Sequence, residues 1–407
     1  MNYLQEFRSN WLSLLATFIG IATGSALSHY TMSLFAPELI AEFGWSKSQF
    51  ALVGSLPLVT MLIVPFAGRF TDRFGVRVAA SIGFAAISIG FFALSAMNGN
   101  IVQFFGIWLF QHIFGVLTTS LVFTRVIVER FDRARGSSLS LLMMGPPLSG
   151  AIAAPVLGSL IAAEGWRTGF IALAVVSGVG GLVCVLLMGR SSRMPRSSPA
   201  RMAHAPLTRH DFLALLADRR FLLLVGGMFL INIPQVFASS QLKLIVLANG
   251  ISNEAATWMV SLYALGVILG RFIFGIALDR IRAHLVAFFA LSLPALGFCI
   301  LAMPSATVPL LAGAVLAVGV AQGAEGDIGS YMISREFDLT NYGLILGFVK
   351  AGLDGGGAVG ALILSFSLQD GGTYQAFLLL SAATTLIGAV CFYLVGHARS
   401  ASSAGSK

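Results

Sequence analysis

The chain has 407 residues, of which 57% are hydrophobic and 10% are charged, and its mean hydropathy is +0.87. This composition excludes a soluble globular protein, in which about 25% of residues are charged. The net charge of +8 comes mainly from Arg in short segments between apolar runs, so it does not indicate nucleic-acid binding. The three cysteines lie singly in apolar runs and predict neither a zinc site nor a disulfide framework.

Apolar runs recur along the whole chain, and each is long enough to cross a bilayer as a helix. The sequence therefore predicts an all-α membrane protein with twelve transmembrane helices in two six-helix bundles, without a cleavable signal before the first helix. The predicted spans are residues 11–36, 48–67, 77–97, 101–124, 137–162, 167–189, 221–245, 255–276, 283–303, 307–331, 341–367 and 374–396.

The domain boundaries follow from the polar segments. Residues 1–189 are expected to form the N-terminal bundle and residues 221–396 the C-terminal bundle. Residues 190–220 are rich in Arg, Ser and Pro and predict a cytoplasmic linker, with a short surface helix at Thr208–Leu216. The Arg-rich loops follow the even-numbered spans. By the positive-inside rule both termini, including the tail at 397–407, are predicted to be cytoplasmic.

A short motif occurs twice, after the second helix of each half. It consists of a glycine followed four and five residues later by Asp-Arg. Its residues are Gly68, Asp72 and Arg73 in the first copy and Gly275, Asp279 and Arg280 in the second. The duplicated motif and the twelve-helix layout resemble the major facilitator superfamily over nearly the whole chain. The resemblance implies a central cavity that opens alternately to the two sides, with the Asp-Arg pairs as gating residues and Arg125 as a candidate partner of Asp72.

A narrower resemblance rests on Leu34–Leu39, on Glu42–Gln49 and on the Gly270-Arg271 pair. These residues look like the monocarboxylate-carrier-like branch and its bacterial relatives. That resemblance implies a small organic anion as substrate, with Arg271 binding its carboxylate. The chain also departs from the branch, because Val267 replaces an Asp one turn before the Arg. The lysine of helix 1 and the Asp-Gly motif before that helix are missing, so proton coupling through those residues does not carry over.

Charged residues inside apolar runs are the main candidate site, since each costs roughly 2.5–3.5 kcal/mol on insertion scales. The guanidinium of Arg271 offers a planar fork that suits a carboxylate. Its alternative interpretation is a structural ion pair with Glu325 or Asp327. Lys350 and Asp354 are four residues apart on one helix face and are expected to pair. They form either a purely internal pair or a second cationic anchor whose partner exchanges.

Glu325 and Asp327 are two residues apart, hence roughly 200° apart around a regular helix. They are not expected to meet one partner unless the helix is broken, which Gly323, Gly326 and Gly329 would permit. One of the two acids is the candidate proton carrier. Tyr331 lies one turn beyond Asp327 and is a candidate substrate contact. The alternative interpretation, which suits Asp327 better than Glu325, is a local pair with Arg335 or a cap near the cytoplasmic helix end.

The remaining candidate substrate contacts are uncharged or titrating polar residues in the predicted spans. The unperturbed pKa of a histidine side chain suits His112 to proton transfer, and the alternative is a simple interhelical hydrogen bond. Gln235 follows Pro234, which is expected to kink the seventh helix. The full set comprises His29, Tyr30, Gln111, His112 and Gln235.

The segment Gly355–Gly360 satisfies a dinucleotide-binding pattern, but no strand precedes it, and close helix packing explains it. No catalytic triad, metal-ligand cluster or phosphate loop appears, so neither an enzyme nor a cofactor is expected. The sequence predicts a proton-coupled secondary transporter of a mono- or aromatic carboxylate, a monomer in the inner (plasma) membrane. The alternatives are efflux of drug-like or cationic compounds and a non-transporting sensor on a carrier fold. Substrate identity, uptake versus efflux, and symport versus antiport stay open.

Overall fold

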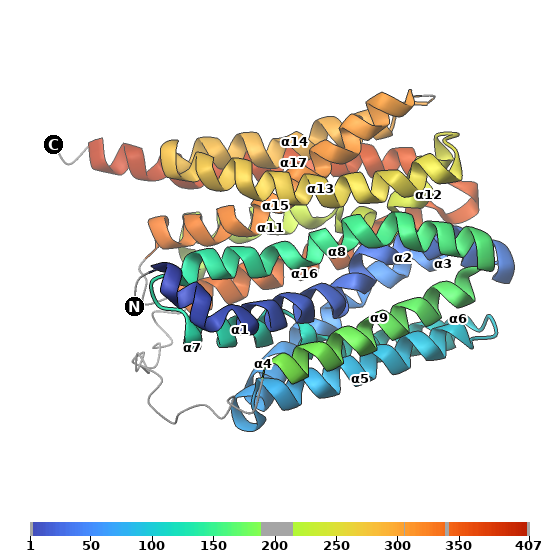
Figure 1. The fold of residues 1–407 in the computed structure, drawn as a ribbon. Helices are drawn as coiled ribbons and strands as arrows, with labels where there is room; N and C mark the ends of the chain where they lie inside the picture. The colour runs from blue at the N-terminus through green and yellow to red at the C-terminus, as the bar shows by residue number, and fades with distance from the viewer. Residues whose placement is uncertain (1–2, 189–214, 305, 338–341, 405–407) are drawn as a thin grey trace. The chain divides into compact units, whose positions relative to one another are not determined.

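The computed structural model describes residues 3–188, 215–304, 306–337 and 342–404, and these contain helices and no strand (Figure 1). Eleven helices are long and apolar enough to cross a membrane, or twelve if the pair Lys47–Thr60 and Leu62–Phe74, bent by 48°, is one span. The predicted all-helical fold is confirmed, and the predicted twelve spans lie within the range of eleven to twelve candidate spans. The predicted surface helix at Thr208–Leu216 lies, up to residue 214, outside the described residues.

The bounds of the helices are α1 (Tyr3–Thr23), α2 (Ser25–Phe43), α3 (Lys47–Ala51), η1 (Leu52–Ser55), α4 (Pro57–Phe74), α5 (Val76–Ser95), α6 (Ile101–Gly115), η2 (Val116–Thr118), α7 (Ser120–Arg130), α8 (Arg135–Glu164), α9 (Trp166–Leu187), α11 (Arg219–Asn232), η3 (Phe237–Gln241), α12 (Leu242–Ala248), α13 (Asn253–Arg280), α14 (Ala283–Leu301), α15 (Val308–Glu336), α16 (Tyr342–Ser367), η5 (Gln369–Gly371) and α17 (Tyr374–Ala404).

Two compact units result from this arrangement. Unit 1 comprises Met1–Pro195 together with the short segments Ala238–Leu244 and Asn253–Ala264. Unit 2 comprises Arg196–Phe237, Ile245–Ser252 and Leu265–Lys407. Most of the predicted linker, at residues 189–214, is outside the described part of the chain.

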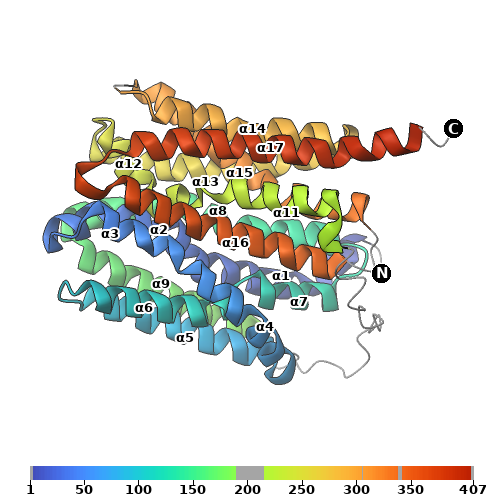
Figure 2. The same cartoon turned by 180° about the vertical axis from the view of Figure 1, so that it is seen from behind.

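In unit 1, α5 packs against α6 and α9, and α1 and α2 pack against α8 (Figure 1 and Figure 2). Its core contains fully buried aromatic side chains, and the rings of Phe35 and Phe170 stack 3.9 Å apart. Glu42 at the end of α2 fixes the start of α9, because its carboxylate accepts from Trp166 Nε1 and lies 2.7 Å from Arg167 Nη1. These side-chain contacts therefore join two helices that are distant along the chain.

In unit 2, α14 packs between α15 and α17, and α11 packs against α16 and α17. The core around these helices contains Phe221, Leu224, Ile328, Met332 and Phe392, all at most 2% exposed. Burial of such side chains is favourable by about 25 cal/mol per Å² of apolar surface relative to water. In a membrane, close packing between helices replaces much of that driving force.

Glycine and proline set several of the breaks between helices. Gly75 and Gly165 have φ of 88° and 87°, which side-chain-bearing residues rarely adopt, and they separate α4 from α5 and α8 from α9. Pro234 lies between the end of α11 and η3, a five-residue π-helix, so the predicted interruption of the seventh span is present.

The first predicted span differs from the structure. Helix begins at Tyr3 instead of residue 11 and continues through a break at Gly24 to Phe43 instead of ending at 36. The early start is anchored by Glu6, whose carboxylate accepts from the backbone N–H groups of Asp132 and Ala134 at 2.7 and 2.8 Å. Hydropathy does not report such polar anchoring.

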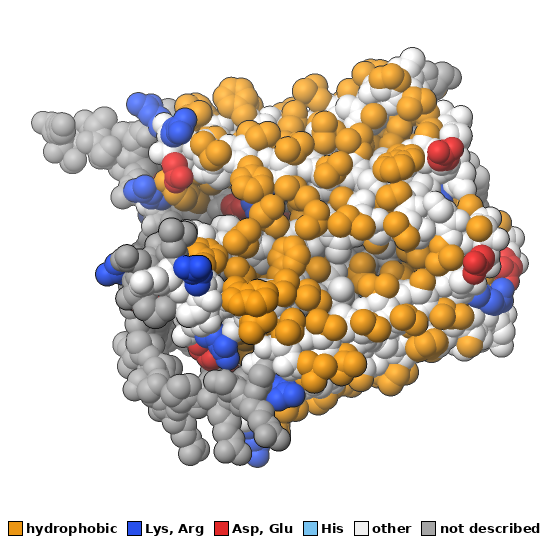
Figure 3. All heavy atoms as spheres, viewed as in Figure 1, with side chains coloured by type: hydrophobic (Ala, Val, Ile, Leu, Met, Phe, Trp, Pro, Cys, Tyr) orange, Lys and Arg blue, Asp and Glu red, His pale blue; other side chains and the backbone are white. Residues whose placement is uncertain are grey.

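The surface matches a membrane environment. Leu62, Phe66, Phe289 and Phe366 have exposed fractions of 65–72%, and many other large apolar side chains are exposed along the helices. On the face drawn in Figure 3, hydrophobic side chains cover the helices and most charged side chains lie near helix ends. In water such a surface would be unfavourable, whereas lipid tails accept it.

Candidate functional site

The helices α13 and α15 approach each other closely through glycines. A Cβ added at Gly270 would overlap the carbonyl oxygen of Val320, and one added at Gly323 would overlap the carbonyl oxygen of Val267. Only a hydrogen atom fits at these points, so the two backbones are in direct contact. This crossing puts the next residue along α13, Arg271, beside the polar stretch of α15.

Arg271 pairs with Asp327 across this crossing. The distance from Arg271 Nε to Asp327 Oδ2 is 3.6 Å, and the two side chains are 26% and 46% exposed. Of the two sequence alternatives for an ionic partner of Arg271, the structure has Asp327. Neither side chain is fully buried.

Glu325 lies in a different environment, although it is only two residues away. Its side chain is 5% exposed, and Asn232 Nδ2 of α11 donates to Oε1 at 2.5 Å. Gln322 Nε2, one turn earlier on α15, donates to Oε2 at 2.9 Å. α15 is continuous from Val308 to Glu336, so the break considered at Gly323, Gly326 and Gly329 is absent, and regular geometry turns the two acids to different neighbours.

Lys350 and Asp354 form the expected pair within α16, with Nζ 3.3 Å from Oδ1. Lys350 is 62% exposed and Asp354 is 12% exposed. α16 approaches α11 through its glycine-rich segment, since a Cβ at Gly356 or Gly360 would overlap a backbone carbonyl oxygen of α11 or the residue after it. The glycine pattern therefore serves helix packing, as the sequence indicated. From the same helix, Lys350 interacts electrostatically with Glu325.

Tyr331 has a partner other than Asp327. Its hydroxyl accepts from Arg335 Nε and Nη2 at 3.3 and 3.1 Å, and the guanidinium of Arg335 lies 5.3 Å from the Tyr331 ring centroid. The ion-pair partner of Asp327 is Arg271 from α13. Gln235 is half-buried beside Gly357 of α16.

Four of the predicted substrate contacts belong to the helices of unit 1. Gln111 is buried against α5, where Nε2 donates to the carbonyl oxygen of Ile87 at 3.0 Å and Oε1 has no hydrogen-bond partner. The ring Nδ1 of His112 lies 3.0 Å from the Trp108 carbonyl oxygen. The rings of His29 and Tyr30 meet edge to face at 5.0 Å.

The first copy of the repeated motif is engaged in an ion pair. Arg125 Nη2 lies 3.0 Å from Asp72 Oδ1 and also donates to the carbonyl oxygen of Gly68 at 3.2 Å. The partner expected for Asp72 is therefore present, and Arg73 lies over the Phe74 ring at 5.3 Å. In the second copy Asp279 and Arg280 are exposed, and within the described ranges neither forms an ion pair.

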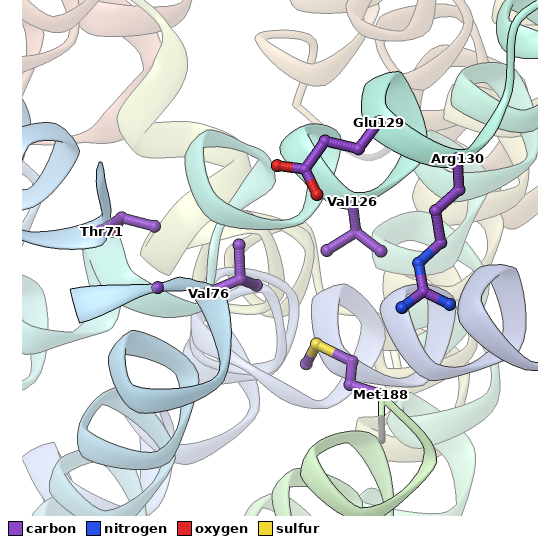
Figure 4. Close-up of a pocket in the computed structure, with 7 residues that line it drawn as sticks. Thr71, Val76, Val126, Glu129, Arg130 and Met188 are labelled. Atoms are coloured by element: carbon purple, nitrogen blue, oxygen red, sulfur yellow. The ribbon is translucent and has the colours of Figure 1, made fainter. Parts of the chain in front are cut away.

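A small pocket adjoins the first motif. In Figure 4 the Glu129 carboxylate, from α7, points toward side chains of α4 and α5 at Thr71 and Val76. The remaining lining residues are Gly75, Val126, Arg130 and Met188. The pocket lies within unit 1, the unit that carries this copy of the motif.

Two features were missed by sequence reasoning. Gln322 was not assigned a role, although its position three residues before Glu325 could have suggested the contact. Lys243 was also not assigned a role, yet it is 1% exposed and interacts electrostatically with Glu38. Its run of polar neighbours after Pro234, Ser239-Ser240-Gln241, was the available signal.

The apolar helices and the charge pairs inside them define a multi-pass membrane protein with a polar site between its helices. The model of the Major Facilitator Superfamily matches residues 14–247 and 236–407, and the chain belongs to this family. The assignment supports secondary transport by alternating access and a non-enzymatic role. Among the residues that the structure describes, no cluster of His, Cys, Asp or Glu could hold a metal ion.

Solved structures with a similar fold include the crystal structure of the nucleoside transporter NupG. It has 16% sequence identity and a TM-score of 0.75, and the match covers 97% of this chain and 99% of that chain. A point mutant of the same transporter has 15% identity and a TM-score of 0.75, and that match covers 94% of this chain and 99% of the other. Identity this low establishes the shared fold alone. No curated protein matches the chain.

Proposed function

We propose that the protein carries a small organic anion, a mono- or aromatic carboxylate, across the membrane together with protons. The observation that supports this proposal is the Arg271–Asp327 pair, an accessible cation inside an apolar helix whose counter-ion is an internal carboxylate. A substrate carboxylate has the same chemistry as Asp327 and competes with it for the guanidinium.

The energetics favour such an exchange. A buried ion pair must offset the desolvation of both charges, and removal of one partner is costly because the other charge stays unpaired. When a substrate carboxylate replaces Asp327, Arg271 keeps a partner throughout. The substrate also adds a negative charge to the site, which favours protonation of a nearby acid, so substrate binding and proton binding favour each other. Glu325 or Asp327 is the acid in this scheme, and Lys350 with Asp354 provides a second cationic anchor.

The proposed transport path involves both halves of the chain. Two six-helix bundles, residues 1–189 and 221–396, enclose the transport path and are joined by a cytoplasmic linker at 190–220. The carrier is a monomer in the inner (plasma) membrane, with both termini cytoplasmic. Asp72, Arg73, Arg125, Asp279 and Arg280 gate the path, while His29, Tyr30, Gln111, His112, Gln235 and Tyr331 line it.

The test is uptake into proteoliposomes with a panel of labelled aliphatic and aromatic carboxylates, with and without a pH gradient. The panel includes a nucleoside, because solved structures of similar fold are of a nucleoside transporter, and a lipophilic cation for the efflux alternative. We expect carboxylate uptake that Arg271→Ala abolishes, Arg271→Lys weakens, and the exposed-loop control Arg282→Ala retains. Carboxylate uptake by Arg271→Ala equal to that of the unsubstituted protein would overturn the anion site.

A further inference from the structure

We infer that Glu325, and not Asp327, is the acid that exchanges the proton, and that the Asn232 amide stabilises it in both protonation states. This inference deepens the proposed function and rests on it. The two acids are neighbours in sequence, but their partners differ in charge. Asp327 has the guanidinium of Arg271, whereas both direct partners of Glu325 are neutral amides.

Charge compensation separates the roles. Asp327 takes part in an ion pair, so its ionised form is the one that the site stabilises. Glu325 belongs to none of the ion pairs formed by the described residues, and its side chain is nearly inaccessible. A carboxylate in that position is costly, and binding a proton removes the charge.

The charged groups around Glu325 come from the neighbouring helices. Lys350 of α16 acts on it electrostatically from beyond ion-pair distance and is itself paired with Asp354. Arg271 of α13 is paired with Asp327 on the other side of α15. The direct contact from α11 is Asn232, which is uncharged. Each cation near the site therefore has its own carboxylate, and Glu325 is the acid in excess.

Asn232 has the chemistry to serve both forms of Glu325. It is 1% exposed, and Nδ2 donates to the Met228 carbonyl oxygen at 2.9 Å as well as to Glu325. Its Oδ1 is buried and has no hydrogen-bond partner. A carboxylate only accepts hydrogen bonds, whereas a carboxylic acid also donates one. Rotation of the amide by about 180° exchanges donor and acceptor, so that Oδ1 receives the new O–H at the expense of the Met228 contact.

The proton step balances without another reactant. A hydronium ion from the open side gives its proton to a Glu325 carboxylate oxygen and leaves water. After the path opens to the other side, water takes the proton back. The unpartnered Oδ1 is the cost of holding the ionised form, because an unsatisfied buried acceptor is unfavourable. In the protonated form Oδ1 gains a donor, but Nδ2 loses its contacts with Met228 and Glu325. Each state therefore has an unpaired buried polar group, and the two states are thereby brought closer in free energy.

The experiment follows the infrared absorption of protonated carboxyl groups during a pH titration of the purified protein in lipid, without substrate. We expect a titrating band that Glu325→Gln removes and the matched control Asp327→Asn retains. Asn232→Leu takes away a hydrogen bond that is stronger to the ionised carboxylate than to the neutral acid. It should therefore move the midpoint of the band upward by about one to two pH units. Asn232→Gln keeps the amide, so its midpoint should lie close to that of the unsubstituted protein.

Isotope labelling covers the case in which Glu325→Gln does not fold. In the unsubstituted protein the band should shift with ¹³C in the carboxyls of glutamate and not with ¹³C in those of aspartate. A band that follows aspartate, or that Asp327→Asn removes, overturns the inference, and an unchanged midpoint in Asn232→Leu overturns the role of the amide. None of these readouts needs a substrate, so they fail or succeed independently of carboxylate uptake.

Discussion

Arg271 of α13 and Asp327 of α15 form an ion pair because the two helices touch at Gly270 and Gly323. The pair is partly exposed, while Glu325, two residues before Asp327, is buried against the amide of Asn232. One short stretch of α15 therefore presents an acid to an arginine on one side and an acid to a neutral amide on the other. Substitutions at these positions test both this division and the packing that produces it.

Asp327→Asn is expected to strengthen substrate binding. The substitution removes the internal carboxylate that competes for Arg271, so the concentration giving half-maximal counterflow should fall by up to about tenfold, equivalent to 1.4 kcal/mol. The measurement is equilibrium counterflow of a labelled carboxylate in proteoliposomes. Asp132→Asn is the matched control, because this exposed carboxylate pairs with Arg135 and its loss leaves the Arg271 and Lys350 pairs intact. An increased half-saturation concentration in Asp327→Asn would contradict direct competition.

Gly323→Ala should destabilise the protein. Its Cβ would overlap the carbonyl oxygen of Val267, and the resulting separation of α13 from α15 is expected to cost about 1–3 kcal/mol, as overpacking usually does. Thermal unfolding in detergent, followed by tryptophan fluorescence, measures the change. Gly326→Ala on the same helix is the control, because nothing lies within 4 Å of its added Cβ. Equal melting temperatures for the two variants would contradict the close crossing.

Asp72 and Arg125 should be energetically coupled. Their side chains are 57% and 21% exposed, so the pair is expected to contribute about 0.2–1 kcal/mol to stability, in the range of exposed ion pairs. A double-mutant cycle with Asp72→Asn and Arg125→Gln, read by thermal unfolding and by counterflow rate, measures the coupling. Asp279→Asn serves as control, and an effect on transport larger than that of Asp72→Asn would show that the second motif copy is the one engaged.

The cysteines should differ in reactivity. Cys184 is fully buried in the core of unit 1, beside Phe123 and Gly20, whereas Cys299 is exposed on α14. A membrane-permeant maleimide is expected to label Cys299 in the folded protein and Cys184 only after denaturation. Mass spectrometry of the labelled peptides provides the readout, with Cys299→Ser as control. Rapid labelling of Cys184 in the folded protein would mean that α1 and α9 do not pack as described.

Much of the fold was predictable because hydrophobicity is a local property of the chain. Runs of apolar residues located the helices, and the Asp-Arg motif indicated the family and the partner of Asp72. The predicted start of the first helix was wrong, because residues 3–10 are tied down by the contact of Glu6 with the backbone at 132 and 134, more than a hundred residues away. The burial of Lys243 was missed because it depends on packing between helices.

The candidate site shows the same division between local and tertiary information. The sequence by itself determined the class of protein, the positions of the intramembrane charges, the pairing of Lys350 with Asp354, and the divergence of Glu325 from Asp327, because helix geometry fixes contacts between residues of one helix. Only the tertiary structure decided that Arg271 meets Asp327 and that Asn232 meets Glu325. Those contacts depend on where glycines let separate helices approach, and that distance is set by packing.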